Sequence, residues 1–150
     1  MVRRIVTWIL VADGARARIF INIGVGKGLS EHPERSFFGS RRQTREIGTD
    51  RPGRTFDSVG AGRHAISPPS DPHERVEAAF ACGVVTWLDG QERAGAFARL
   101  IVLADPRTLG VVRRALTPKL AARLSAELAG DFTRADVHAV EARVATVLAV

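Results

Sequence analysis

The chain has 150 residues, of which 45% are hydrophobic and 25% are charged, a composition typical of a soluble globular protein. Its formal net charge is +6 and its isoelectric point is about 11.1, which indicates an anionic partner, nucleic acid before an acidic membrane surface. The single cysteine, Cys82, excludes an internal disulfide and a cysteine-based metal cluster, and no apolar run is long enough to span a membrane.

The first part of the chain predicts three antiparallel strands. Residues 5–12 are apolar on both alternating faces, which is typical of a central strand covered on two sides. Asp13-Gly14 supplies a tight hairpin turn, and the returning strand alternates apolar and polar residues. The glycines of residues 24–28 lack the spacing of a phosphate-binding loop, so we expect a simple turn there. A third, weaker strand is predicted near residues 29–37.

A long basic segment follows, at about residues 39–70. It is too polar and too rich in glycine to form core, and loops of this length are usually functional or disordered. It holds Glu46, Asp50 and Asp57 against six arginines: Arg41, Arg42, Arg45, Arg51, Arg54 and Arg63. Arginine binds phosphate with a planar, two-pronged group. A bias toward arginine codons is an alternative explanation of the overall charge, but it explains the clustering in one loop less well.

The strongest helix signal comes directly after this segment. Asp71, Pro72 and Glu74 are typical of a helix start, with a capping residue, a first-position proline and a first-turn carboxylate. Apolar residues then recur at spacings of three and four, which predicts one buried stripe: Val76, Phe80, Gly83, Val84, Trp87 and Leu88. Cys82 lies off this stripe.

Two further strands and two further helices are predicted in the last third of the chain. Residues 99–104 form a short apolar strand pattern, and Asp105-Pro106 starts a helix that reaches about residue 116. Residues 120–128 fit both the strand period and the helix period, and the strand interpretation is kept. Thr133 with Asp136 predicts the start of a final amphipathic helix.

The predicted order is therefore three strands, a loop, a helix, a strand, a helix, a strand and a helix. Such an order implies an α/β protein with a five-stranded mixed sheet and helices on its faces. No internal repeat divides the chain, so we expect one domain over residues 1–150.

The residues that carry acid–base chemistry offer little support for an enzyme. The four histidines are scattered without metal-ligand spacing, so neither a metal nor another cofactor is expected. Asp13 is interpreted as a hairpin-turn residue rather than a catalytic carboxylate. His64 is a weak candidate for a general base, because no orienting partner is identifiable and a triad with Ser58 and Asp57 has no nucleophile elbow. A non-catalytic protein is the favoured expectation.

Several motifs, taken together and in order, resemble a known bacterial family. They are the residues from Trp8 to Phe20, Asp50 to Ser58, Gly60 to His64, Asp71 to Glu74 and Leu100 to Gly110. Together they resemble the host attachment proteins, described as required for attachment to host cells, over Val6 to about Leu148.

This family in turn resembles the middle domain of eukaryotic and archaeal peptide-chain release factors, which implies a similar fold. In release factors the glycine-rich loop carries Gly-Gly-Gln and enters the peptidyl-transferase centre of the ribosome. The corresponding residues here run from Gly60 to His64, where Gly60 and Gly62 still permit close backbone approach but the glutamine is absent. The chemistry of peptide release therefore does not carry over.

These observations lead to three functional hypotheses. The first is a cytoplasmic module that binds RNA (rRNA or tRNA) or the ribosome, with the six loop arginines on phosphates and Gly60, Gly62 and His64 beside them. The second is a hydrolase of a tRNA or nucleotide ester that uses His64. The third is a protein-interaction factor for attachment to host cells. Residues 1–14 imitate a signal peptide without a small-residue cleavage site, so we expect a cytoplasmic protein without membrane insertion.

Overall fold

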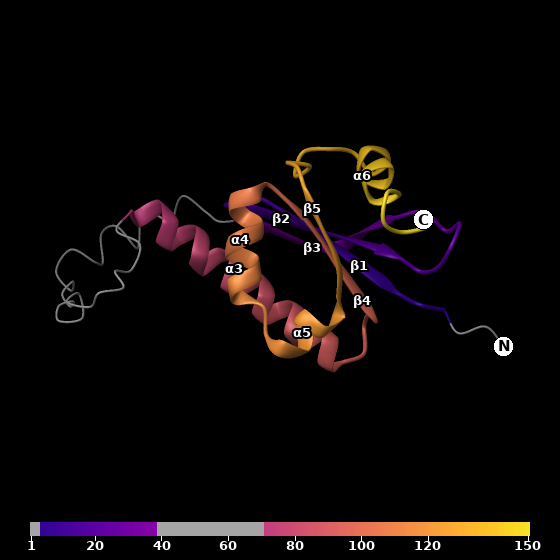
Figure 1. Ribbon diagram of the computed structural model, residues 1–150, viewed down its shortest axis with the longest axis horizontal. Coiled ribbons are helices and arrows are strands. Elements are labelled where there is room, and N and C mark those ends of the chain that lie inside the picture. The colour runs from indigo at the N-terminus through magenta and orange to yellow at the C-terminus, as the bar shows by residue number, and fades with distance from the viewer. Residues whose placement is uncertain (1–3, 39–70) are drawn as a thin grey trace.

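The computed structural model describes residues 4–38 and 71–150. Its strands are β1 (Thr7–Ala12), β2 (Arg16–Asn22), β3 (Ser30–Phe38), β4 (Arg99–Ala104) and β5 (Leu124–Ala129). The helices of the described residues are α3 (Pro72–Arg93), α4 (Pro106–Ala115), α5 (Pro118–Arg123) and α6 (Val137–Val144). Figure 1 shows their arrangement.

The strands form one mixed sheet in the order β3-β2-β1-β4-β5. β2 is antiparallel to both β1 and β3, whereas β4 is parallel to β1 and β5 is parallel to β4. β1 lies at the centre of the sheet and all six of its residues are buried, as its two-faced apolar pattern predicts. β3 is an edge strand, which tolerates Pro33 because proline has no N–H to donate. The predicted five-stranded mixed sheet is confirmed.

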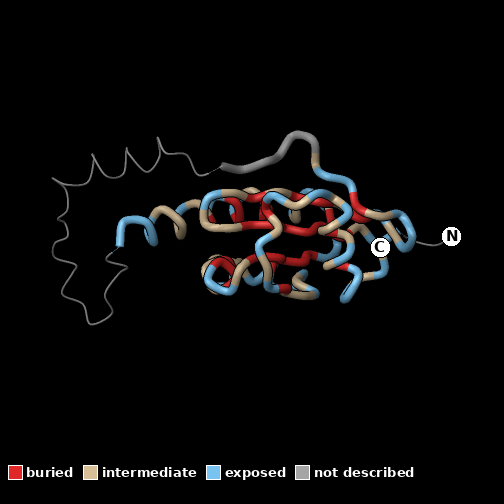
Figure 2. The backbone as a smooth tube through the Cα atoms, turned by 90° about the horizontal axis from the view of Figure 1, so that it is seen from above, coloured by how far each residue is buried: buried red, intermediate tan, exposed pale blue. Residues whose placement is uncertain are grey.

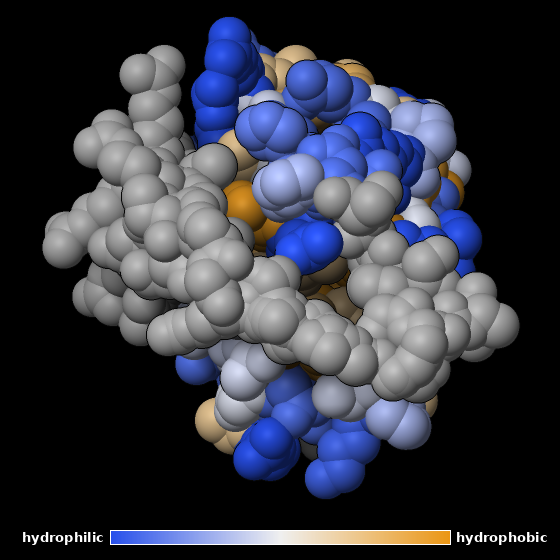
Figure 3. Space-filling view, turned by 90° about the vertical axis from the view of Figure 1, so that its left-hand side faces the viewer, coloured by the Kyte–Doolittle hydropathy of each residue, from blue (hydrophilic) through white to orange (hydrophobic). Residues whose placement is uncertain are grey.

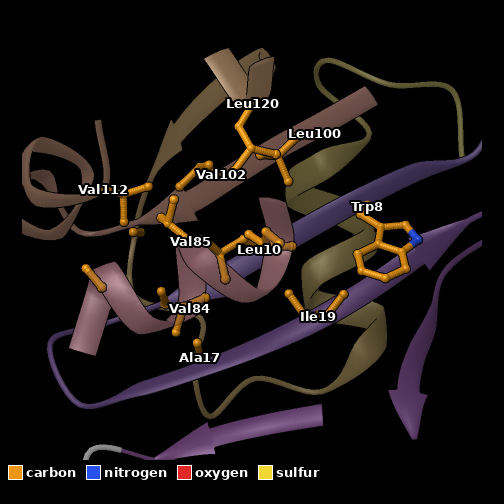
Figure 4. Packing of buried hydrophobic residues seen from close by; sticks show 14 of the residues in the cluster. Trp8, Leu10, Ala17, Ile19, Val84, Val85, Leu100, Val102, Val112 and Leu120 are labelled. Carbon is orange, nitrogen blue, oxygen red and sulfur yellow. The ribbon is translucent and has the colours of Figure 1, made fainter. Parts of the chain in front are cut away.

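The two faces of the sheet are covered unequally. Helices α3, α4 and α5 pack on one face, where Trp8, Leu10 and Leu100 of the sheet belong to one buried cluster with Val84 and Val85 of α3 (Figure 4). Helix α6 packs on the other face through Val140 and Val144, which are fully buried against alternate residues of the same strands. In Figure 2 the buried residues form the centre of this layered body, and the start of α3 extends beyond it. No helix in the described ranges is long and apolar enough to span a membrane.

Residues 120–128, which fit both the helix period and the strand period, are divided between a short helix and a strand in the structure. Thr117 caps α5 with its side chain, and Pro118 occupies the first turn, so a helix begins there. After Arg123 the chain changes to β5, whose Leu128 is buried against the sheet. The structure thus has one short helix more than the predicted order, because the proline and its threonine cap lie just before the alternating residues.

Some local expectations are wrong in detail. On α3 the buried residues include Ala81 and Val85, whereas Gly83 of the predicted stripe is exposed. The start of α6 is capped by Asp136, whose side chain accepts a hydrogen bond from the Ala139 N–H. Thr133 has a different role: it is buried and bonded to aspartates, as described below.

Candidate functional site at the carboxyl edge of the sheet

The basic segment is attached at the edge where the parallel strands end. Phe38, the last residue of β3, pairs with Arg16 at the start of β2, which is the same edge at which β1 ends. The chain is described again from Asp71, and α3 starts beside the residues that follow β1. In open α/β sheets, ligand sites form outside the carboxyl ends of the strands, where neighbouring connections diverge. Here that place lies between β1 and β4.

The predicted binding residues themselves lie outside the described residues. They are Arg41, Arg42, Arg45, Arg51, Arg54, Gly60, Gly62, Arg63 and His64. Their role therefore stays a prediction. What the structure describes is the surface from which their segment departs and to which it returns.

A cleft of about 410 Å³ lies at this edge. Residues from three elements line it: the Asp13 turn after β1, the first turns of α3 with His73 and Glu77, and the start of α4 with Asp105 and Arg107. Figure 3 looks at this end of the molecule, where the described surface is mostly hydrophilic with small apolar areas. Three carboxylates thus face two basic side chains.

Asp13 is held as a turn residue. One carboxylate oxygen, Oδ1, accepts hydrogen bonds from the backbone N–H groups of Ala15 (2.8 Å) and Arg16 (2.7 Å). The other, Oδ2, lies 3.2 Å from the Thr133 hydroxyl, which also lies 2.7 Å from Oδ1 of Asp131. The hydrogen bonds from Thr133 lower the pKa of Asp131. Oδ1 of Asp13 is therefore committed to the turn, in agreement with the hairpin interpretation, and Oδ2 lies beside a hydroxyl whose single proton is shared with the nearer Asp131.

Asp105 begins α4 in the same structural way. Its side chain accepts hydrogen bonds from the Thr108 N–H (3.1 Å) and the Thr108 hydroxyl (2.6 Å), which satisfies donors of the first helical turn. Thr108 is buried beneath this cap. The sequence prediction of a helix start at Asp105-Pro106 is confirmed.

Arg107 connects the two helices that flank the cleft. Its Nη2 lies 3.0 Å from Oε1 of Glu77 and 3.7 Å from Oε1 of Glu74, so a residue of α4 pairs with two residues of α3. Glu77 also lies against the backbone of Gly14: a Cβ atom at Gly14 would approach Glu77 Oε2 to 2.5 Å. Only glycine permits this close contact without displacing the glutamate. This contact between α4, α3 and the Gly14 turn could not be predicted from the sequence, because its residues are far apart along the chain and follow no common motif.

The described histidines have different environments. His73 is exposed at the cleft, and the His138 side chain is 84% exposed on α6. His32 of β3 packs edge-on against Trp8 of β1 and Trp87 of α3, with ring centroids 5.5 and 5.9 Å apart. This contact was not predicted, because its members come from three elements far apart in the chain. No group of three or more potential metal ligands occurs in residues 4–38 and 71–150.

The sequence matches the family described as "Protein required for attachment to host cells" over residues 8–144. The chain belongs to this family. The matched range includes every residue that lines the cleft at the carboxyl edge, from Asp13 to Thr108, and the whole basic segment. The family resemblance seen in the sequence motifs is therefore confirmed.

The fold is also similar to two solved archaeal structures, both with a TM-score of 0.46. One is described as an archaeal protein, at 14% identity, and the other as the archaeal translation termination factor aRF1, at 13% identity. Each alignment covers 84% of this chain and 30% of the other, so the chain spans about a third of their length. No curated protein matches the sequence.

Proposed function

We propose that this host attachment family protein binds RNA, and that the arginines of residues 39–70 contact the phosphates. The distribution of charge carries this proposal. The segment holds six arginines and three acidic residues, a net charge of +3, which is half of the +6 of the entire chain. It occupies 32 of the 150 residues. RNA is the polyanion that such a concentration of guanidinium groups suits best.

The pairing of arginines in the described body supports the same conclusion. Five of them contact carboxylates: Arg18 with Glu31, Arg93 with Asp89, Arg107 with Glu77, Arg113 with Glu127 and Arg123 with Glu92. A guanidinium that is already paired with a carboxylate is less available to a phosphate. These five positive charges of the body are therefore compensated internally.

The attachment of the segment also supports the proposal. The described residues that flank the segment lie at one edge of the sheet: Phe38 pairs with Arg16 at the start of β2, and α3, which begins after Asp71, lines the cleft with its first turns. The cleft itself has an acidic lining, so the phosphates are assigned to the arginines and not to the cleft. Under this proposal the protein acts in the cytoplasm on rRNA or tRNA, and the attachment named by the family is an indirect consequence.

The test is charge reversal within the segment. The variant Arg51→Glu/Arg54→Glu/Arg63→Glu is compared with the unaltered protein for binding to bulk tRNA between 50 and 200 mM salt. Each lost phosphate contact removes about 0.7 from the slope of log affinity against log salt for a single strand. We expect the slope to fall by about 2 and the affinity at low salt to fall at least about tenfold.

A matched variant separates the segment from the total charge. Arg114→Glu/Lys119→Glu/Arg134→Glu changes three exposed cations of the body, and so changes net charge by the same amount. We expect it to retain most of its affinity for tRNA, and the segment variant to keep the melting temperature of the unaltered protein. Equal losses in both variants, or no loss in the segment variant, would overturn the assignment. Crosslinking in cells that recovers protein and no RNA would favour an attachment factor instead.

A further inference from the structure

A second hollow, of about 720 Å³, lies at the opposite edge of the sheet, where β1 and β4 begin and β2 ends. We call it the amino-edge groove. One wall is the turn that follows β2, from Ile23 to Lys27, and another is the chain after α6, from Val147 to Ala149. These walls are joined by a hydrogen bond from the Gly26 N–H to the main-chain oxygen of Val150 (3.1 Å).

The groove collects the exposed apolar side chains. Among the described residues the large hydrophobic side chains that are exposed are Ile5 (42%), Ile23 (41%), Val25 (79%) and Val147 (47%), and all of them line the groove. Single exposed apolar residues are common on protein surfaces, but contiguous ones mark binding sites. Their convergence on one hollow indicates that it receives an apolar group.

The same groove has a positive lining. Arg4, Lys27 and Arg99 line it, all three are exposed, and none forms an ion pair in the part of the chain that the structure describes. No aspartate or glutamate is part of the lining. Arg107 and Arg123 of the helix layer differ in this respect, because each pairs with a glutamate of α3. The groove is therefore complementary to an anion that also has an apolar part.

A buried hydroxyl lies in the floor of the groove. Thr7 is 1% exposed and lies between Asn22 and Arg99 in the sheet register, so the three residues share one face. The Asn22 side chain is satisfied: it donates to the Gly28 carbonyl (2.9 Å) and accepts from the Gly24 N–H (3.1 Å). The Thr7 hydroxyl has no hydrogen-bond partner among the described residues. A buried polar group without a partner is uncommon, and a polar atom of a ligand in the groove would supply one.

We propose that the amino-edge groove binds a fatty carboxylate. The acyl chain lies against Ile23, Val25 and Val147, and the carboxylate accepts hydrogen bonds from Arg99, Lys27 and the Thr7 hydroxyl. The volume is within the range of small-molecule sites, which combine apolar walls with a few convergent polar groups. A single fatty-acid molecule can enter the groove and place its carboxylate at the buried Thr7 hydroxyl, whereas the flat surface of a membrane cannot reach that hydroxyl. The site is independent of the RNA proposal, because it lies at the other edge of the sheet.

Calorimetric titration of the full chain with dodecanoate tests the proposal. We expect dodecanoate to bind at least about tenfold more tightly than dodecanol, which has the same chain without the charge, and acetate not to bind measurably. Equal binding of dodecanoate and dodecanol would overturn the anionic part of the proposal. No binding of dodecanoate, or association only with vesicles that contain anionic phospholipid, would overturn the site as a whole.

Two variants then locate the ligand. Arg99→Gln keeps much of the side-chain length and is expected to weaken dodecanoate about tenfold, because charge-assisted hydrogen bonds are the stronger ones. Thr7→Val is expected to weaken it several-fold while the melting temperature of the free protein stays the same or rises, because a partnerless buried hydroxyl is removed. If Thr7 had only a structural role, its substitution would not weaken dodecanoate binding while leaving the melting temperature unchanged or higher.

Controls separate the two proposals and the effect of charge. Arg114→Gln removes one exposed cation on α4 and is expected to bind dodecanoate as the unaltered protein does. The segment variant Arg51→Glu/Arg54→Glu/Arg63→Glu is also expected to bind it normally. If Arg114→Gln weakens dodecanoate as much as Arg99→Gln does, the attraction is a property of the net charge, and the assigned site is wrong.

Discussion

At the scale of single residues, Asp13 shows how a candidate catalytic carboxylate is committed to structure. It follows the central strand directly and lines the cleft, as a catalytic residue would. Yet its Oδ1 accepts hydrogen bonds from two backbone N–H groups, and its Oδ2 lies 3.2 Å from the hydroxyl of Thr133, which is 120 positions away in the chain. The turn and the distant segment are therefore joined by one side chain.

Substitution of Asp13 measures this structural role. Asp13→Ala removes the acceptors of two backbone donors and is expected to lower the free energy of unfolding by about 1–2 kcal/mol. Asp13→Asn keeps the oxygen that accepts from Ala15 and Arg16, so a smaller loss is expected. Urea denaturation of both variants provides the measurement. RNA affinity should be unchanged in each; a loss of affinity in the stable Asp13→Asn would assign the cleft to binding.

At the scale of elements, polar contacts join the helices of one face to each other. Asp89 of α3 is 8% exposed, forms an ion pair with Arg93, and accepts a hydrogen bond from the hydroxyl of Thr117 (2.9 Å), which caps α5. The hydrogen bonds from Arg93 and Thr117 lower the pKa of Asp89 below its ordinary value of 3.8. Arg123 of α5 pairs in turn with Glu92 of α3 at 3.2 Å.

The lowered pKa of Asp89 predicts a pH dependence of stability. Because the folded pKa is below the unfolded one, the stabilisation is fully present above about pH 4 and is lost as the pH falls through the folded pKa. We expect Asp89→Asn to have a lower melting temperature than the unaltered protein at neutral pH. As the pH is lowered, the melting temperature of Asp89→Asn should fall less than that of the unaltered protein. Asp136→Asn is the control, because asparagine also caps a helix. Parallel declines for Asp89→Asn and the unaltered protein in acid would contradict the role of this carboxylate.

At the scale of the whole molecule, the two faces of the sheet are protected by very different amounts of helix. Helix α3 has 22 residues and is joined by α4 and α5, whereas the eight-residue α6 covers the other face. A helix of that length has little stability of its own. It depends on Val140 and Val144, on Arg18, which donates to the Ala135 carbonyl (2.6 Å), and on Glu141, which accepts from the Leu29 N–H (2.9 Å).

This asymmetry predicts unequal hydrogen exchange. The backbone amides of α6 are expected to exchange through local opening at a lower free energy than the amides of residues 81–88 in the middle of α3. Mass spectrometry of deuterium uptake in peptides from the two helices gives the comparison. Glu141→Gln weakens the contact with Leu29 and should accelerate exchange in α6 and leave the middle of α3 unaffected. Equal protection of the two helices would show that α6 opens only when the whole molecule unfolds.

Much of the fold was predictable because its signals are local. The two-faced apolar run of β1, the Asp13-Gly14 turn and the aspartate–proline starts of α3 and α4 are each read from a few neighbouring residues, and each is confirmed. Residues 120–128 were ambiguous because their pattern fits two periods. The Thr117 cap fixes where α5 begins, and the backbone becomes extended at Leu124, where β5 begins. The arginines of the basic segment, from Arg41 to Arg63, lie outside the described residues, and their binding role stays a prediction.

The sequence by itself determined the strands, most of the helices, the family and the place of the charge excess along the chain. Only the tertiary structure decided which distant groups meet: Thr133 with Asp13, Glu141 with Leu29, and His32 with two tryptophans. It also brought three cations, Arg4, Lys27 and Arg99, and the exposed apolar side chains into the amino-edge groove. The physical reason is that capping and periodicity act over a few residues, whereas a pocket is formed by side chains that sheet pairing brings together from remote segments.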